Sequence, residues 1–321
     1  MCIHPRFTGC VLLLAVAALV LLPAAALSQT TPRTPWGDPD LQGVWNNGTV
    51  TPLERPAQFA NKEFLTEAEA AAYEKDMVTR QNVDAREGSV GTDADVSKAY
   101  NEVWWEHGSK VVASRRTSIV YDPPNGKVPA LTAEGQARVK RLAAARAKAD
   151  NPDTWTDMTV RDRCIIYRPL PNLPTNNNNN FQIVQGPGYV AILQEEIHET
   201  RIIPLDNSPH LPSTVRLWLG DARGHWDGDT LVVDTTNFTD QTDFRGAGAN
   251  LHLVERYTRV GADRIDFEFT VEDAATWTRP WSGAYTFWQN AGLLYEYACH
   301  EGNYALKHIL EIARDAEKNP R

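Results

Sequence analysis

The chain has 321 residues and a formal net charge of −9 at pH 7, and ten of its residues are Trp. This length is enough for one large β-rich domain with added helices. An acidic surface repels the phosphates of nucleic acids and of anionic lipids, so both are poor partners. We expect a small-molecule ligand or substrate instead, and the oligomeric state stays open.

Residues 1–28 have the pattern of an export signal. Arg6 supplies a positive charge, and an apolar run extends from Cys10 to Ala26. Such a segment is removed after export, here near Ser28, so we expect a periplasmic or secreted protein. The alternative is a retained membrane anchor, which Pro23 within the apolar run disfavours.

After a linker at 29–40, residues 41–321 are expected to form a single β-rich domain with helical insertions. Thr66 followed three residues later by Glu69 is a capping box, which marks the start of a helix. Thr132 is a similar start signal for the second helix. The two helical insertions and the terminal helix are predicted at 62–81, 133–149 and 305–318.

From about residue 181 onward, short apolar runs are separated by turn residues. Asp227-Gly228 between two such runs is typical of a two-residue hairpin turn. Consecutive strands joined by short turns predict a mainly β fold. The expected form is an antiparallel meander that makes a calycin-like barrel or a strongly curved sheet, with two N-terminal helices and a C-terminal helix. The predicted strands are 182–185, 189–196, 199–205, 215–226, 229–238, 251–260, 264–272, 283–289 and 293–299.

Two cysteines, Cys164 and Cys299, stand downstream of the export signal. In an exported protein such a pair predicts one disulfide. It would connect the start of the meander to its last predicted strand. Two buried thiols are the alternative.

Three sequence blocks carry a resemblance to other proteins. They are WLGDARGHWDGDTLVVDT at 218–235, LHLVER at 251–256 and EYACHEGN at 296–303. They resemble those of a group of exported proteins from soil bacteria that carries no assigned reaction. Separately, Gly43-Val-Trp45 is similar to the opening of lipocalin-like barrels, which implies ligand binding.

No named catalytic motif occurs in the sequence. There is no Gly-x-Ser-x-Gly elbow, Walker loop or Cys-x-x-Cys pair. His198-Glu199 and His300-Glu301 each begin like a zinc-protease helix, but the fifth position of each is not His. We therefore expect no cofactor and no metal centre. The alternative is a metal site formed by His198, His300 and one Glu, because residues on neighbouring strands can converge.

Five ionisable residues are candidates for catalysis: His198, Glu199, Arg201, Glu296 and His300. Strand alternation places Glu199 and Arg201 on one face, with Arg201 as an anion clamp and Glu199 as its partner or a base. Glu296 and His300 would share a face of the last strand. The alternatives are a structural Glu–Arg ion pair for the first cluster and a strand entering a polar loop for the second.

A second set of residues is expected to contact a ligand. Large aromatic side chains can line an apolar pocket, although core packing is an alternative for each of them. Glu255 and Arg256 point to opposite faces of their strand, so one of them is expected to be buried and paired. The predicted ligand-binding residues are Trp105, Trp218, Glu255, Trp281, Trp288 and Asn303.

These observations favour an exported protein that binds a small aromatic, terpenoid or sugar-derived molecule in a β-barrel pocket. The first alternative is a cofactor-free lyase, isomerase or hydrolase that uses a His/Glu pair, with Arg201 as clamp. The second is a structural or partner-binding protein. Strongly shifted titration of a residue among His198, Glu199, Glu296 and His300 in one cleft would favour the enzyme. An apolar, charge-free cavity would favour the carrier.

Overall fold

The computed structural model describes residues 31–84, 91–92 and 101–319. The predicted export signal at 1–28 lies outside the described residues. The chain from Thr31 onward groups into one compact unit. Among the described residues we find no helix that is long and apolar enough to cross a membrane.

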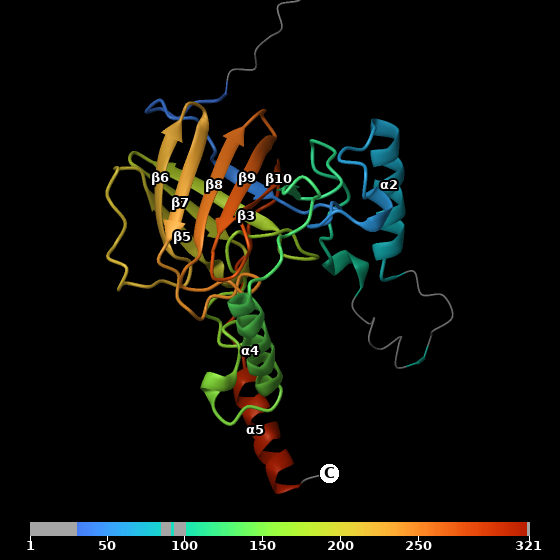
Figure 1. Ribbon diagram of the computed structural model, residues 1–321, viewed down its shortest axis with the longest axis vertical. Coiled ribbons are helices and arrows are strands. Elements are labelled where there is room, and N and C mark those ends of the chain that lie inside the picture. The colour runs from blue at the N-terminus through green and yellow to red at the C-terminus, as the bar shows by residue number, and fades with distance from the viewer. Residues whose placement is uncertain (1–30, 85–90, 93–100, 320–321) are drawn as a thin grey trace, which may run out of the picture. The chain divides into compact units, whose positions relative to one another are not determined.

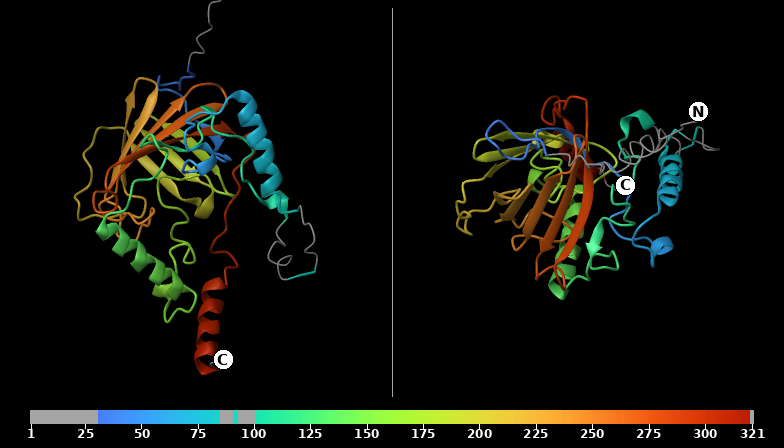
Figure 2. Two further views of the ribbon diagram at one scale, coloured as in Figure 1. Left: turned by 45° about the vertical axis from the view of Figure 1, so that its right-hand side comes forward. Right: turned by 90° about the horizontal axis from the view of Figure 1, so that it is seen from above.

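Ten strands form one antiparallel sheet that curls until it nearly closes into a barrel (Figures 1 and 2). Its order is β5-β4-β3-β1-β10-β9-β8-β7-β6, and β2 also pairs with β10. The edge strands β5 and β6 approach closely, because a Cβ added at Gly224 would lie 2.8 Å from Ile203. The predicted mainly β fold is confirmed. The strands are β1 (Gly43–Asn46), β2 (Val120–Asp122), β3 (Asn180–Gly186), β4 (Tyr189–Gln194), β5 (Thr200–Pro204), β6 (Asp221–Asp227), β7 (Thr230–Thr236), β8 (His252–Arg259), β9 (Arg264–Glu272) and β10 (Trp281–Gln289).

Side-chain alternation fills the barrel interior with apolar groups. In β9 the residues Ile265, Phe267, Phe269 and Val271 are buried, while the acidic residues between them lie on the outer face. Aromatic rings from neighbouring strands meet there, and Phe267 lies 4.7 Å from Tyr285 between ring centroids. Burial of these rings supplies the main apolar stabilisation of the barrel.

Three α-helices occur in the described residues: α2 (Glu67–Gln81), α4 (Ala133–Ala149) and α5 (Ala305–Lys318). The capping box of Thr66 and Glu69 is present at the start of α2. In α4 the glycine at position 135 allows close packing, because a Cβ there would lie 2.3 Å from the Thr276 carbonyl oxygen. This contact places α4 against the segment between β9 and β10.

Several predicted strands are shorter than expected or absent. Residues 293–299 form no strand, because β10 already pairs with β9 and β1 on its two sides. Residues 215–220 belong to a loop, and β6 begins at Asp221. The chain leaves β4 at Glu195 through a one-turn 3-10 helix, η4 (Glu196–His198), and not as a continuous strand.

The described part of the predicted linker, residues 31–40, contacts the barrel. Arg33 forms an isolated antiparallel β-bridge with Pro39 and an ion pair with Asp229 at the β6–β7 turn. The adjoining Leu41 is fully buried, and its backbone N–H donates to Gln185 in β3. Residues 31–40 are therefore fastened to the barrel.

Candidate functional site

The interior of the barrel holds a buried ion pair. Arg201 on β5 donates to Glu255 on β8 over 2.6 and 3.1 Å, and to the Thr235 hydroxyl on β7 over 3.2 Å. The Tyr257 hydroxyl donates to the same Glu255 carboxylate over 3.1 Å. Burial raises the pKa of Tyr257 well above its usual value, and the nearby Glu255 charge adds to this rise. The phenol therefore stays protonated and available as a donor.

This ion pair leaves almost no space for a ligand. The cavity beside Arg201 and Glu255 measures about 10 Å³, and Phe181, Ile183 and Phe287 are among the side chains that enclose it. A single water requires at least that volume, and small-molecule pockets are about 300–1,000 Å³. The interior is thus a packed core, and the predicted pocket does not lie there.

A larger groove of about 680 Å³ lies at one end of the barrel, beside α4. Its apolar surface comes from the C-terminal half of α4, from a proline-rich loop and from the segment before α4. The Trp277 ring is 1% exposed and forms part of the wall. The lining residues are Glu54, Val128, Pro129, Leu131, Val139, Leu142, Ala143, Arg146, Arg168, Pro169, Pro171, Leu173, Thr175, Asp243, Phe244, Arg245, Gly246 and Trp277.

A tight turn presents Arg245 to the groove. Arg245 and Gly246 have φ values of +54° and +97°, and the Ala247 N–H donates to the Phe244 carbonyl over 3.0 Å. Positive φ at both central positions is typical of a type I′ turn, in which arginine is strained. Strain of about 1–3 kcal/mol persists only where the surrounding structure imposes it, often at a functional site.

The charged side chains of the groove differ in whether they form ion pairs. Arg146 and Asp243 form an ion pair of 2.7 Å. Arg168 is buried and pairs with Glu196, whereas Arg245 is exposed and forms no ion pair with the described residues. Arg146 and Arg168 are thus balanced by carboxylates, and Arg245 is the lining arginine whose charge has no ion-pair partner in the described part of the chain, which favours a negatively charged ligand.

Arg168 connects the groove to buried carboxyl groups behind it. Its Nε lies 2.7 Å from Glu196 Oε2, and its Nη2 donates to Glu196 Oε1 over 3.0 Å. Asn178 donates to the same Oε1 over 3.1 Å, and Glu196 is fully buried. The adjoining Ile197 has φ of +54°, which is a strained conformation for a β-branched residue. The η4 turn is thus held in one shape by the Glu196 contacts.

Two carboxyl groups of this region titrate near neutral pH. Burial raises the pKa of Glu199 to about 8, although the backbone N–H of Tyr167 donates to its Oε1 and opposes the rise. Burial also raises the pKa of Glu196 to about 7, and the charge of Arg168 opposes this. Glu199 Oε2 is buried without a hydrogen-bond partner among the described residues. At neutral pH, Glu199 is mainly an uncharged acid.

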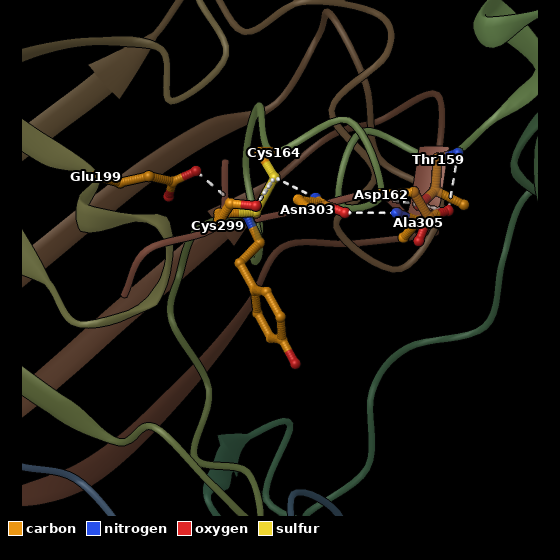
Figure 3. The surroundings of a disulfide bond; sticks show 8 residues. Thr159, Asp162, Cys164, Glu199, Cys299, Asn303 and Ala305 are labelled. Carbon is orange, nitrogen blue, oxygen red and sulfur yellow. Dashed lines mark hydrogen bonds between the residues drawn. A yellow bond between two sulfur atoms is a disulfide. The ribbon is translucent and has the colours of Figure 1, made fainter. Parts of the chain in front are cut away.

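The predicted disulfide between Cys164 and Cys299 is confirmed, with the two Cα atoms 5.9 Å apart. Figure 3 shows Glu199 on one side of the disulfide and Asn303 on the other. The Asn303 amide donates to Cys164 Sγ over 3.4 Å. Cys164, Asn303 and His300 are among the residues that line a second groove of about 310 Å³. The disulfide is consistent with an oxidising compartment outside the cytoplasm.

The candidate catalytic residues do not form one cluster. Glu199 and Arg201 have different partners, Tyr167 and Glu255, so the expected pair between them is wrong. Glu296 is exposed on an irregular segment, and it does not share a strand face with His300. The backbone of His198 lies in η4, and its side chain is outside the described part of the structure.

The candidate ligand-binding residues are similarly dispersed. Trp281 is fully buried and stacks on Phe244 with ring centroids 5.9 Å apart, so it supports the groove wall from behind. Trp105 stacks on a neighbouring histidine, and Trp218 lies in the loop before β6. Trp288 is partly buried on β10. Glu255 is in the barrel core and Asn303 in the second groove.

No metal centre is apparent in the described ranges, where no three His, Cys, Asp or Glu residues are placed to hold a metal ion. Comparisons with protein-family models and with curated proteins found no match. The resemblance to exported soil-bacterial proteins therefore stays an expectation.

The residues that shape the main groove carry no clear signal in the sequence. Arg168 and Arg245 each stand in an irregular segment without periodicity, so neither is predicted as a site residue. The only local signals were the prolines that follow Arg168 and the Arg245-Gly246 pair, which is compatible with a turn. Neither signal shows that the two segments meet.

Proposed function

We propose that the protein binds a small, largely apolar molecule with one negatively charged group in the groove beside α4. The observation that supports this most is the combination of a 680 Å³ volume, mainly apolar walls and an exposed Arg245 without an ion pair to the described residues. Such a lining fits an aromatic or terpenoid carboxylate better than a neutral sugar, because sugars require many polar partners. The ligand would lie at the end of the barrel and not inside it.

Arg245 and Leu142 would have separate roles in this groove. Leu142 is partly exposed on α4 and would contact the apolar body of the ligand. Arg245 would pair with the negative group, since its guanidinium has no ion-pair partner among the described residues. The strain of its left-handed conformation would be retained to hold the guanidinium in place.

Fluorescence titration with 8-anilinonaphthalene-1-sulfonate, an aromatic anion, tests the proposal. The Arg245→Asn variant keeps a residue that tolerates positive φ, and Leu142→Asp places a charge on the apolar wall. We expect each change to weaken binding at least tenfold, or about 1.4 kcal/mol. Arg141→Ala is the matched control, because Arg141 is exposed on α4 but does not line the groove. Unchanged binding in both groove variants would refute the proposal.

Acid–base catalysis is a second candidate, favoured by Glu199. A carboxylic acid that is uncharged at neutral pH and lacks a partner for one oxygen can donate a proton. Glu199 does not line the groove itself, but the charge of Glu196, which pairs with Arg168 of the lining, adds to the rise in the pKa of Glu199. If a natural ligand that copurifies with the protein is recovered chemically unchanged, the protein is a carrier. If the parent protein converts that ligand and the Glu199→Gln variant does not, the protein is an enzyme.

A further inference from the structure

A row of ionisable side chains crosses the outer face of the sheet from β6 to β9. Asp221, Asp234, His252 and Glu272 stand on four successive strands, and His210 reaches them from the loop 205–220. Their neighbours along each strand point into the core, so these side chains face outward. The row belongs neither to the ligand groove nor to the buried ion pair.

Short contacts join the members of this row. His210 Nδ1 lies 3.0 Å from Asp221 Oδ2, and His210 Nε2 lies 2.8 Å from Asp234 Oδ1. The other Asp234 oxygen lies 2.7 Å from His252 Nε2. Beyond them, Glu272 lies 3.7 Å from His252 Nδ1. Acidic and basic groups thus alternate along the row.

The geometry at His210 requires a doubly protonated ring. Both of its ring nitrogens face carboxylate oxygens, which only accept hydrogen bonds. A neutral imidazole has one N–H, so only the imidazolium form donates to Asp221 and to Asp234 together. Loss of one proton would leave a nitrogen lone pair facing a carboxylate, and that contact would become repulsive.

The loop that carries His210 depends on polar contacts. It connects β5 to β6, the two edge strands of the barrel, and every residue from 205 to 220 is at least partly exposed. The Leu211 N–H donates to Asp221 Oδ2 over 2.8 Å, and Arg223 Nε donates to the Pro209 carbonyl over 3.1 Å. Leu205 and Leu219, at the two ends of the loop, pack partly against the core, whereas these polar contacts hold the segment around His210 against the sheet.

We propose that Asp221, His210 and Asp234 form a proton-operated latch for the loop 205–220. The latch is closed when the His210 ring carries both protons and opens when it loses one. Arg223 on β6 pairs with Asp221 over 2.6 Å, and this contact does not involve the His210 ring. The latch does not depend on whether the groove binds a ligand.

The neighbouring pair of Asp234 and His252 depends on pH in the same direction. The hydrogen bond to Asp234 raises the pKa of His252, and the same bond lowers the pKa of Asp234. Stabilisation by His252 is complete below about pH 6.5 and is lost as the pH rises through its folded-state pKa. Stabilisation by Asp234 is lost only in acid, so the contact between these two residues is strongest in mildly acidic solution.

The latched loop also contacts residues that are close in the chain to one wall of the ligand groove. The Thr242 hydroxyl donates to the Trp218 carbonyl over 2.7 Å, and Arg216 donates to the Ala249 carbonyl over 2.7 Å. Thr242 and Ala249 flank the turn that carries Arg245. Release of the loop would therefore loosen a segment next to the groove.

Amide hydrogen exchange tests the latch directly. The protection factor of the Leu211 N–H, corrected for the pH dependence of intrinsic exchange, should fall at least tenfold between pH 5.5 and pH 8.5. In His210→Gln it should be low at both values, because a Gln side chain cannot donate to both carboxylates at these positions. His225→Gln is the matched control, since His225 is exposed on the outer face of β6. It should behave like the parent protein.

The protonation state of the ring gives a second test that needs no variant. Nitrogen NMR of the His210 ring at pH 5.5 should show both nitrogens protonated, and at pH 8.5 a neutral ring. A neutral ring at pH 5.5 would overturn the proposal, even if His210→Gln fails to fold. Equal protection of Leu211 at the two pH values would also overturn it.

Discussion

Arg201 and Glu255 lie 54 residues apart in the chain and meet inside the barrel, with Nη2 and Oε2 separated by 2.6 Å. They come from β5 and β8, which are not neighbours in the sheet. Their contact therefore exists only because the sheet curls. Since both side chains are almost fully buried, the pair is part of the core and is not a ligand clamp.

Arg201→Leu should destabilise the protein by about 3–5 kcal/mol, because it leaves the Glu255 charge buried without its partner. Arg201→Leu combined with Glu255→Leu should recover most of this loss, since the two charges are removed together. Urea unfolding of the parent, the single variant and the double variant measures the difference. A double variant as unstable as the single one would contradict this explanation.

Glu199→Gln should change how stability depends on pH. The folded-state pKa of Glu199 is raised to about 8, so the folded protein binds its proton more tightly than the unfolded chain does. Stability from this group is therefore complete below about pH 4.5 and is lost as the pH rises toward 8. The parent should lose stability relative to Glu199→Gln over this range, at up to about 1.4 kcal/mol per pH unit.

Thermal or urea unfolding at several pH values between 4.5 and 8.5 would measure this. Glu296→Gln is the control, because Glu296 is exposed. Parallel pH profiles for the parent and Glu199→Gln would mean that Glu199 is not the titrating group.

Replacement of Cys164 and Cys299 by serine should release the C-terminal segment. Residues 291–303 form no helix or strand, and the disulfide fastens them to the loop at 164. We expect faster proteolysis within 291–304 and a loss of stability of up to about 5 kcal/mol, since the bridge closes a loop of 135 residues. The intact parent should be about 2 Da lighter than its reduced form.

Mass spectrometry of limited digests would locate the cleavage sites. A cleavage pattern that is the same with and without the disulfide would show that other contacts hold this segment.

Local sequence signals determined the elements that depend on residues close in the chain. The capping box at Thr66 and Glu69 joins positions three residues apart, and the turn at Gly228 joins adjacent strands. The alternation from Ile265 to Val271 shows which face is buried, because strand period is a local property. The disulfide also followed from the sequence, since only two cysteines stand downstream of the predicted signal.

Only the tertiary structure decided which distant residues meet. Residues 293–299 have strand-forming side chains, but both edges of β10 are taken by other strands. Arg168 and Arg245 line one groove because two irregular loops converge near α4. His210 meets Asp234 because a loop folds across the sheet. Such contacts depend on strand order and on the curl of the sheet, which arise from the packing of the whole chain and leave no periodic signal in it.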